Sequence, residues 1–242
     1  MENINWTLLT NHAQRELCKE NIDWNNKDAV IKSVQQNGLT LEYASKGLQD
    51  DEDIVIAAVQ QNGLALAYAS KELRNDRNIV TAAVRQNGWA LEHASKELRN
   101  DRNIVTAAVR QNGWALQFAS EELRNDKEVV LNAVQQNGLT LGSTFGKWRD
   151  DKDIVMEAVK QNGTALIYAS KELQDNKEIV LATLQSTPDV FIYVSPRLKQ
   201  DQEVQKAAGL EPDIDTVLGD AIKWCQEHND APTAQPKLNI ER

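Results

Sequence analysis

A glycine recurs every 25 residues through the middle of the chain. These glycines are Gly38, Gly63, Gly88, Gly113, Gly138 and Gly163, and each follows a Gln-Asn pair. A fixed period of this length is typical of repeat proteins, in which each unit packs only against its neighbours. The spacing therefore predicts a stack of small units rather than one irregular core.

Residues 75–99 illustrate one unit, with the sequence NDRNIVTAAVRQNGWALEHASKELR. Apolar residues at helical spacing predict a first helix that ends near Gln86 and buries one stripe. The stripe consists of Ile79, Val80, Ala83 and Val84. We expect Gly88 to end this helix in the left-handed conformation. A shorter second helix over about 89–94 should follow, and Leu98 should anchor a turn into the next unit.

The start of each first helix carries a short polar residue with a second polar or acidic residue three positions later. The pairs are Asp50 and Asp53, Asn75 and Asn78, Asn125 and Glu128, and Asp175 and Glu178. This spacing is typical of a capping box, in which the first residue caps the helix. The Gln-Asn-Gly triplets could form a ladder of amides for a ligand. We interpret them instead as helix stops, because Asn can bond free backbone groups there.

One unit cannot fold alone, because its few large apolar side chains supply at most ~1.5–3 kcal/mol each, whereas ordering costs roughly 1.5 kcal/mol per residue. We therefore predict an all-α fold, a right-handed α-solenoid of about seven 25-residue two-helix repeats with capping helices at both ends. The predicted parts are an N-terminal capping segment (1–24), tandem helical repeats (25–200), C-terminal capping helices (201–228) and a disordered tail (229–242).

Charge and cysteine content narrow the class of protein. The formal net charge is −9, and no basic track suits a nucleic acid. Cys18 and Cys225 lie at opposite ends and cannot form a disulfide framework. The N-terminus does not resemble a signal peptide, and no apolar run approaches ~20 residues. We expect a cytoplasmic monomer without a cofactor, a metal site, a nucleic-acid partner or a membrane span.

The repeated pattern D-x-x-[IV]-V-x-A-A-V-x-Q-N-G-x-x-L-x-[YF]-A-S-x-x-L-[RQ]-[ND]-D resembles the domain-of-unknown-function 4116 repeat across roughly residues 25–200. The resemblance implies an interaction scaffold of the kind found in protists and bacteria. The resemblance also implies a relation to effectors that intracellular pathogens deliver into a host cytosol. It brings no catalytic residues. The chain departs from the pattern at residues 142–148, where the Tyr-Ala-Ser segment is replaced.

Two almost identical units carry the first candidate binding surface. Its residues are Thr81, Arg85, Trp89, Thr106, Arg110 and Trp114. Helical spacing places the Thr and Arg residues on the solvent side of the first helix, and Trp and Arg are enriched in interface hot spots. The alternative interpretation is buried Trp, solvated Arg and simple duplication.

The fifth unit carries the second candidate, a pocket or hinge at Gly142, Phe145, Gly146 and Trp148. The two glycines should weaken the second helix, and the two aromatic residues could refill the gap. Neutral degeneration of the unit is the alternative. Cys225 and His228 are spaced so that the histidine could activate the cysteine as a thiolate nucleophile. Nothing orients the histidine, and we expect no catalysis there.

The leading hypothesis for function is a non-catalytic repeat scaffold for protein–protein interaction, with an effector in a host cytosol as a biological setting. An enzyme, or the accessory repeat region of one, with a site near the fifth unit is the first alternative. A helical repeat that reads single-stranded nucleic acid is the second, and the acidic charge disfavours it.

Overall fold

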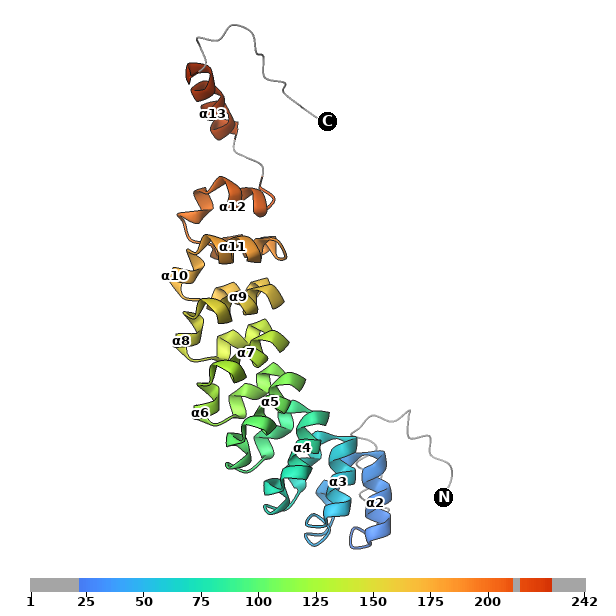
Figure 1. The fold of residues 1–242 in the computed structure, drawn as a ribbon. Coiled ribbons are helices and arrows are strands. Elements are labelled where there is room, and N and C mark those ends of the chain that lie inside the picture. The colour runs from blue at the N-terminus through green and yellow to red at the C-terminus, as the bar shows by residue number, and fades with distance from the viewer. Residues whose placement is uncertain (1–21, 211–213, 228–242) are drawn as a thin grey trace, which may run out of the picture.

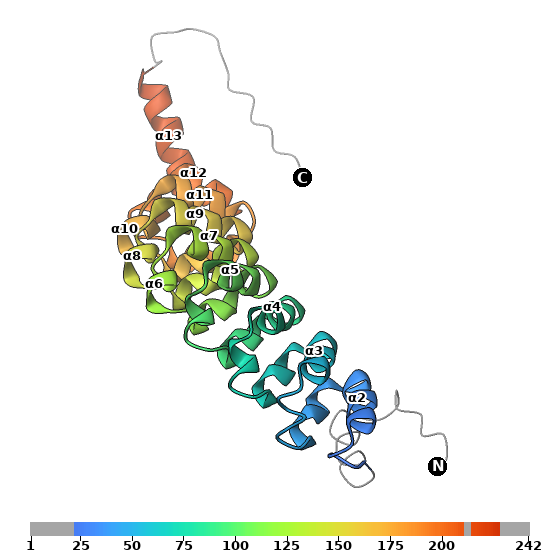
Figure 2. The ribbon, with the colours of Figure 1, turned by 60° about the horizontal axis from the view of Figure 1, so that its bottom comes forward.

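A computed structural model describes residues 22–210 and 214–227 (Figure 1). Within these ranges every regular element is helical and no strand is present. The helices stack into a curved column, and a second view turns the same column to show its twist (Figure 2). The predicted all-α solenoid is therefore confirmed.

Each repeat contains an α-helix followed by a six-residue 3₁₀ helix. The α-helices are α2 (Lys27–Gln36), α3 (Glu52–Gln61), α4 (Arg77–Gln86), α5 (Arg102–Gln111), α7 (Lys127–Gln136), α9 (Lys152–Gln161) and α11 (Lys177–Leu184). The 3₁₀ helices are η2 (Gly38–Tyr43), η3 (Gly63–Tyr68), η5 (Gly88–His93), η7 (Gly113–Phe118), η8 (Gly138–Ser143), η9 (Gly163–Tyr168) and η10 (Pro188–Tyr193). The predicted second helix is thus a 3₁₀ helix.

From the second repeat onward, a short turn of helix links each repeat to the next. These turns are η4 (Leu73–Asn75), η6 (Leu98–Asn100), α6 (Glu121–Arg124), α8 (Gly146–Arg149), α10 (Lys171–Gln174) and η11 (Leu198–Gln200). In Figure 1, α6, α8 and α10 follow one edge of the column. The helix α12 (Gln202–Ala207) begins an eighth unit, and α13 (Ile214–Glu227) follows it.

Two layers run along the column, because each α-helix contacts the α-helices of adjacent units and each 3₁₀ helix contacts adjacent 3₁₀ helices. The predicted stripe of α4 lies between the layers, and all of its side chains are buried. Leu91 and Ala94 close the core from the 3₁₀ side. In the seventh unit the corresponding position is filled by Thr183 rather than by the predicted Ala182, and the Thr183 hydroxyl donates to Ile179 O.

The predicted caps are wrong by one residue. Asp76, not Asn75, caps α4, and its carboxylate accepts from the backbone N–H groups of Asn78 and Ile79. With the cap at Asp76, each unit begins one residue later than predicted, so that Asn75 ends the preceding linking turn and accepts a hydrogen bond from Ser95 Oγ of the following unit. Two adjacent residues are both good caps, and the contact with the neighbouring unit decides which of them caps the helix.

The predicted reason for the glycines is also wrong. Among the described residues, only Gly209 has a positive φ, 71°. Asn87 ends α4 in an extended conformation, and its side chain accepts from Trp89 N. A Cβ on Gly88 would lie 2.5 Å from Ala108 O in the next unit. The period-25 glycine is therefore required for close approach between units, not for a left-handed helix stop.

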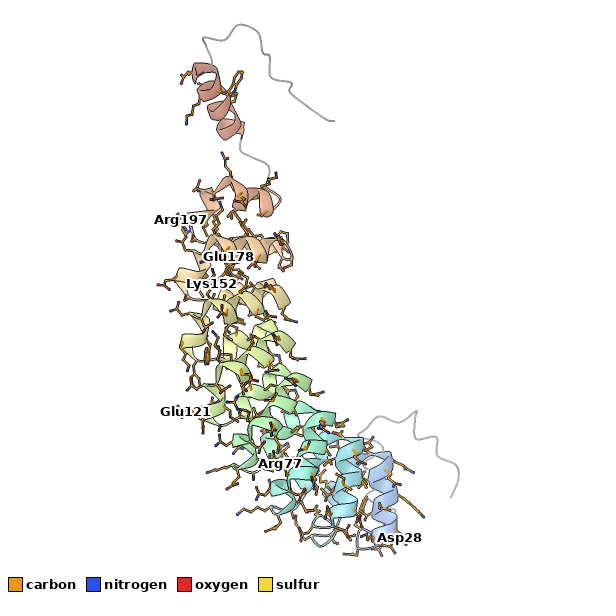
Figure 3. The ribbon with its side chains drawn as sticks, viewed as in Figure 1. Asp28, Arg77, Glu121, Lys152, Glu178 and Arg197 are labelled. Atoms are coloured by element: carbon orange, nitrogen blue, oxygen red, sulfur yellow. The ribbon has the colours of Figure 1, made fainter. Side chains whose placement is uncertain are left out.

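A ladder of ion pairs follows the α-helix N-termini. The first residue of one helix is a cation that pairs with acids at the start of the next helix, as Lys152 does with Glu178 at 2.5 Å (Figure 3). Arg102 pairs in the same way with Asp126. Position 52 breaks the ladder, because Glu52 stands where the neighbouring units carry a cation. Exposed pairs of this kind stabilise only modestly, and salt screens them.

The two ends of the chain are described only in part. Of the predicted capping segment 1–24, residues 1–21 lie outside the described residues, as do the predicted tail 229–242, His228 and the side chain of Cys225. The described apolar side chains Leu218, Ile222 and Trp224 of α13 are exposed. The capping role of the last helix and the handedness of the superhelix stay predictions.

Candidate interaction surface

The predicted Trp/Arg/Thr surface is divided between the two layers. Thr81 and Arg85 lie on α4, on the side away from the buried stripe, and Arg85 is exposed. Trp89 instead is the second residue of the 3₁₀ helix η5. The same division repeats one unit later, with Thr106 and Arg110 on α5 and Trp114 on η7. The structure therefore brings each residue type into register with its copy, but it gives the Arg and Trp residues to different layers.

The two tryptophans differ in their surroundings. The Trp89 ring packs edge-on against Phe118 of the next unit, with ring centroids 5.5 Å apart, and keeps 37% of its surface exposed. Trp114 is half-buried, and the residue that corresponds to Phe118 beside it is Ser143. Trp89 is thus both a packing residue and an accessible one, a combination that suits an interface anchor.

The two arginines also differ. Arg110 donates from Nε to Asn132 Oδ1 in the next unit at 2.8 Å. The residue that corresponds to Asn132 beside Arg85 is Ala107, which offers no side-chain acceptor. Arg85 is therefore the more available cation of the predicted pair.

The 3₁₀ layer presents a continuous strip that sequence reasoning found only at its two tryptophans. We define the 3₁₀ strip as the partly exposed side chains at the second and last positions of η2 to η9. They are Leu39, Tyr43, Leu64, Tyr68, Trp89, His93, Trp114, Phe118, Leu139, Ser143, Thr164 and Tyr168. The adjacent third and fourth positions are buried, so the strip is one row of varied side chains on a constant core. The period-25 variation at these positions was the signal in the sequence.

Cations and amides bind backbone carbonyls at the ends of several 3₁₀ helices. In the fifth unit Arg149 donates to Gly142 O at 2.5 Å, and in the seventh Lys199 donates to Ile192 O at 2.8 Å. Gln49 and Gln174 take the same position in the first and sixth units and donate to Leu41 O and Leu166 O. These side chains satisfy carbonyl groups that a helix end leaves free.

One hollow of about 660 Å³ opens beside the strip between the first and second units. Tyr68 lines it, and charged side chains of both signs surround the ring, among them Glu42, Lys46, Lys71 and Arg74. The Ser-Lys-Glu-Leu segment that supplies part of this wall recurs in other units, so no single residue in the sequence marked it. A mixed-charge wall around an aromatic ring suits a polar peptide segment better than an apolar ligand.

His93 replaces the Tyr or Phe of the strip in the third unit. Burial lowers the pKa of this imidazole below its ordinary value, and the nearby Arg74 cation lowers it further, while Glu92 opposes the shift. His93 is therefore neutral near pH 7 and packs as a ring.

The fifth unit is regular in its backbone, contrary to the prediction that its glycines weaken the second helix. The 3₁₀ helix η8 is six residues long, as are the neighbouring η7 and η9. Gly142 leaves room for Tyr168, whose nearest ring atom, Cζ, lies 2.8 Å from the position that a Cβ would occupy. Trp148 is buried at the position of Leu98 and donates from Nε1 to Arg124 O at 3.2 Å.

The other aromatic residue of this unit is also packed. The Arg124 guanidinium lies over the Phe145 ring, with Arg124 Cζ 5.1 Å from the ring centroid. Gly146 begins α8 and has open space around it. Phe145 and Trp148 therefore fill the unit, and the role of the four residues as a pocket or hinge stays a prediction.

Residues 22–210 and 214–227 contain no cluster of three or more His, Cys, Asp and Glu side chains able to hold a metal ion. None of the helices in these ranges combines the length and apolar content needed to cross a bilayer.

Comparison with known proteins identifies the repeat. The family model described as "Domain of unknown function (DUF4116)" matches six overlapping segments, at residues 26–74, 51–99, 76–124, 101–144, 126–174 and 151–199. Each segment starts at the residue that caps an α-helix. No curated protein and no solved structure matched the chain.

Proposed function

Because the chain belongs to the DUF4116 repeat family, whose description names no activity, we propose a function from its surface: a non-catalytic scaffold that binds a protein or peptide along the 3₁₀ strip. The observation that carries the proposal is the strip itself. It places a half-exposed aromatic or aliphatic side chain at the same point of successive units, above a core that hardly varies. Extended surfaces of solenoids are well suited to such binding.

The composition of the strip supports a protein partner. Tyr, Trp and Phe supply large contact areas at low entropic cost. Trp89 is the most exposed of its tryptophans and lies near the centre of the row. The net charge of −9 supports a protein or peptide partner over a nucleic acid, which requires a basic surface.

The test replaces both tryptophans by the residue that other units carry at the same position. Trp89→Leu with Trp114→Leu keeps an aliphatic packing group, as at Leu39 and Leu64, but removes both indoles. We expect a partner captured by the intact chain to bind at least tenfold more weakly to this variant, with little change in Tm. Arg85→Ala, on the α layer, is the matched control and should bind normally.

Three outcomes separate the alternatives. Loss of binding with Arg85→Ala alone would move the interface to the α layer. Equal binding by the intact chain, the double tryptophan variant and Arg85→Ala would show that neither the two tryptophans nor Arg85 contributes to the interface. Turnover of a substrate by the purified chain would replace the scaffold by an enzyme.

The proposal extends to the place of action. We propose that this chain acts as a monomer in a cytosol, that of its producer or of a host cell, because the resemblance of its repeat pattern implies a relation to effectors. A reporter fused to the chain, followed during infection of host cells, tests delivery. A signal that stays in the producing cell would reject the effector role and leave the scaffold intact.

A further inference from the structure

Six Asn-Gly dipeptides give the chain a reactive chemistry that the binding function does not use. In such a dipeptide the glycine nitrogen can attack Cγ of the asparagine side chain, because no Cβ hinders its approach. The new N–C bond closes a succinimide ring and expels ammonia. Water then opens the ring at either carbonyl, so that the asparagine becomes aspartate or isoaspartate. The nitrogen must lose its proton and turn toward Cγ, so any contact that holds the N–H slows the reaction.

Five of the six glycine N–H groups are held by the following unit. Each donates to Oε1 of a glutamine 23 residues later, at 2.5 to 2.7 Å. The pairs are Gly38 with Gln61, Gly63 with Gln86, Gly88 with Gln111, Gly113 with Gln136, and Gly138 with Gln161. The backbone at these five glycines is also confined, because a carbonyl oxygen of the next α-helix lies against the position that a Cβ would occupy.

Gly163 lacks the first of these restraints, the hydrogen bond to a glutamine. Ser186 occupies the position of the glutamine, and its hydroxyl donates to Thr183 O at 3.2 Å. Within the described residues, the Gly163 N–H has no hydrogen-bond acceptor. The backbone of Gly163 is still confined, but by the side chain of Thr187 rather than by a backbone carbonyl, because Thr187 Oγ1 and Cβ both lie against the position of a glycine Cβ.

The asparagines themselves are equivalent. Asn162 has φ −153° and ψ 108°, and Asn112 has φ −151° and ψ 111°. In both, the side-chain Oδ1 accepts from the backbone N–H two residues later, at 3.0 Å. The local sequence and geometry therefore match, and the hold on the following glycine is what differs.

From this comparison we infer that Asn162 is a site of spontaneous deamidation in the folded protein, and that the Gln ladder protects the other five. Isoaspartate at position 162 would insert one methylene into the backbone beside Gly163, where the sixth unit packs against the seventh. The modification would thereby loosen the last complete unit from the stack.

The experiment follows deamidation of the folded, full-length chain at mildly alkaline pH by peptide mass spectrometry. We expect conversion at Asn162 to be about fivefold faster than at Asn112, the factor that corresponds to one net hydrogen bond of about 1 kcal/mol. In urea, where the ladder is absent, the six sites should react at similar rates. Equal rates at Asn162 and Asn112 in the folded protein would overturn the inference.

Two variants separate the hydrogen bond from fraying at the end of the stack. Ser186→Gln restores the acceptor and should slow conversion at Asn162 toward the rate at Asn112. Gln111→Ala frees Gly88 in the middle of the stack and should speed conversion at Asn87 by a similar factor. Circular dichroism checks that both variants remain helical. If Gln111→Ala folds and Asn87 stays as slow as Asn112, the ladder does not protect, and fraying explains any excess at Asn162.

Discussion

Close packing at the period-25 glycine gives the sharpest test of how the units are held together. An alanine Cβ at Gly113 would lie 2.5 Å from Ala133 O and 3.1 Å from Gln136 Oε1. Ordinary carbon–oxygen contacts lie at about 3.3–3.6 Å. The obstacle at 2.5 Å is a backbone carbonyl of α7, which no side-chain rotation can move. Gly113→Ala must therefore push the fourth and fifth units apart by about 1 Å.

The cost follows from two losses and one gain. Overpacking costs about 1–3 kcal/mol. The hydrogen bond from Gly113 N to Gln136 Oε1, 2.7 Å long, would stretch, and a net hydrogen bond contributes about 0.5–1.5 kcal/mol. The smaller entropy of the unfolded alanine chain offsets about 0.4–1 kcal/mol. We expect Gly113→Ala to lower the free energy of unfolding by roughly 1–4 kcal/mol, with Tm falling by about 2–4 °C for each kcal/mol.

Urea unfolding followed by circular dichroism measures this change, and the chain supplies its own control. Gly146 begins α8, and a Cβ there would meet nothing within 4 Å. Gly146→Ala should leave stability unchanged or raise it by up to about 1 kcal/mol. If both variants unfold at the same urea concentration as the original chain, close approach between units is not what the repeated glycine provides.

Three further predictions concern charge. Glu52→Arg should complete the ion-pair ladder opposite Asp76 and raise the unfolding free energy by about 0.2–1 kcal/mol. That gain should disappear at high salt, whereas a gain that persists would point to packing. Arg102→Gln should lower the unfolding free energy near neutral pH and make it less dependent on acid, because hydrogen bonding to Arg102 lowers the pKa of Asp126. The stability from a lowered carboxyl pKa is complete above the unfolded pKa and is lost as pH falls through the folded value, so the two proteins' unfolding free energies should converge at low pH. His93→Phe should flatten the pH dependence of stability below about pH 6.5. Burial lowers the pKa of His93, so the imidazole of the unfolded chain takes up a proton at a higher pH than that of the folded chain. An unchanged slope of unfolding free energy against pH, measured by urea titrations, would contradict this.

Sequence periodicity predicted what depends on one unit alone. The stripe of α4 and its end at Gln86 follow from spacing within 25 residues, and the structure confirms both. The errors arise where two units meet. The choice of Asp76 over Asn75 as cap depends on Ser95 of the next unit, and the need for glycine at position 88 depends on a carbonyl of α5. Such contacts leave a repeated residue type in the sequence but do not state their physical reason.

The candidate surface shows the same limit. The sequence identified Trp89 and Arg85 by residue type, but their placement on separate layers depends on where the α-helix ends and the 3₁₀ helix begins. The 3₁₀ strip around Trp89 exists because successive 3₁₀ helices stack, and the sequence does not state that stacking. Half-exposure is a property of the stack, because the neighbouring unit covers the other half of each side chain.

The fifth unit tests whether the identity of the obstacle matters as much as the distance. A Cβ at Gly142 would lie 2.8 Å from Tyr168 Cζ, the far end of a side chain that can turn. In the first unit Glu42 coexists with Tyr68 at the equivalent positions, so the ring has another place to lie. We therefore expect Gly142→Ala to change the unfolding free energy by less than about 1 kcal/mol, because a shifted ring costs less than a shifted backbone. A loss equal to that of Gly113→Ala would mean that Tyr168 cannot turn, and that the fifth unit is as rigidly packed as its regular neighbours.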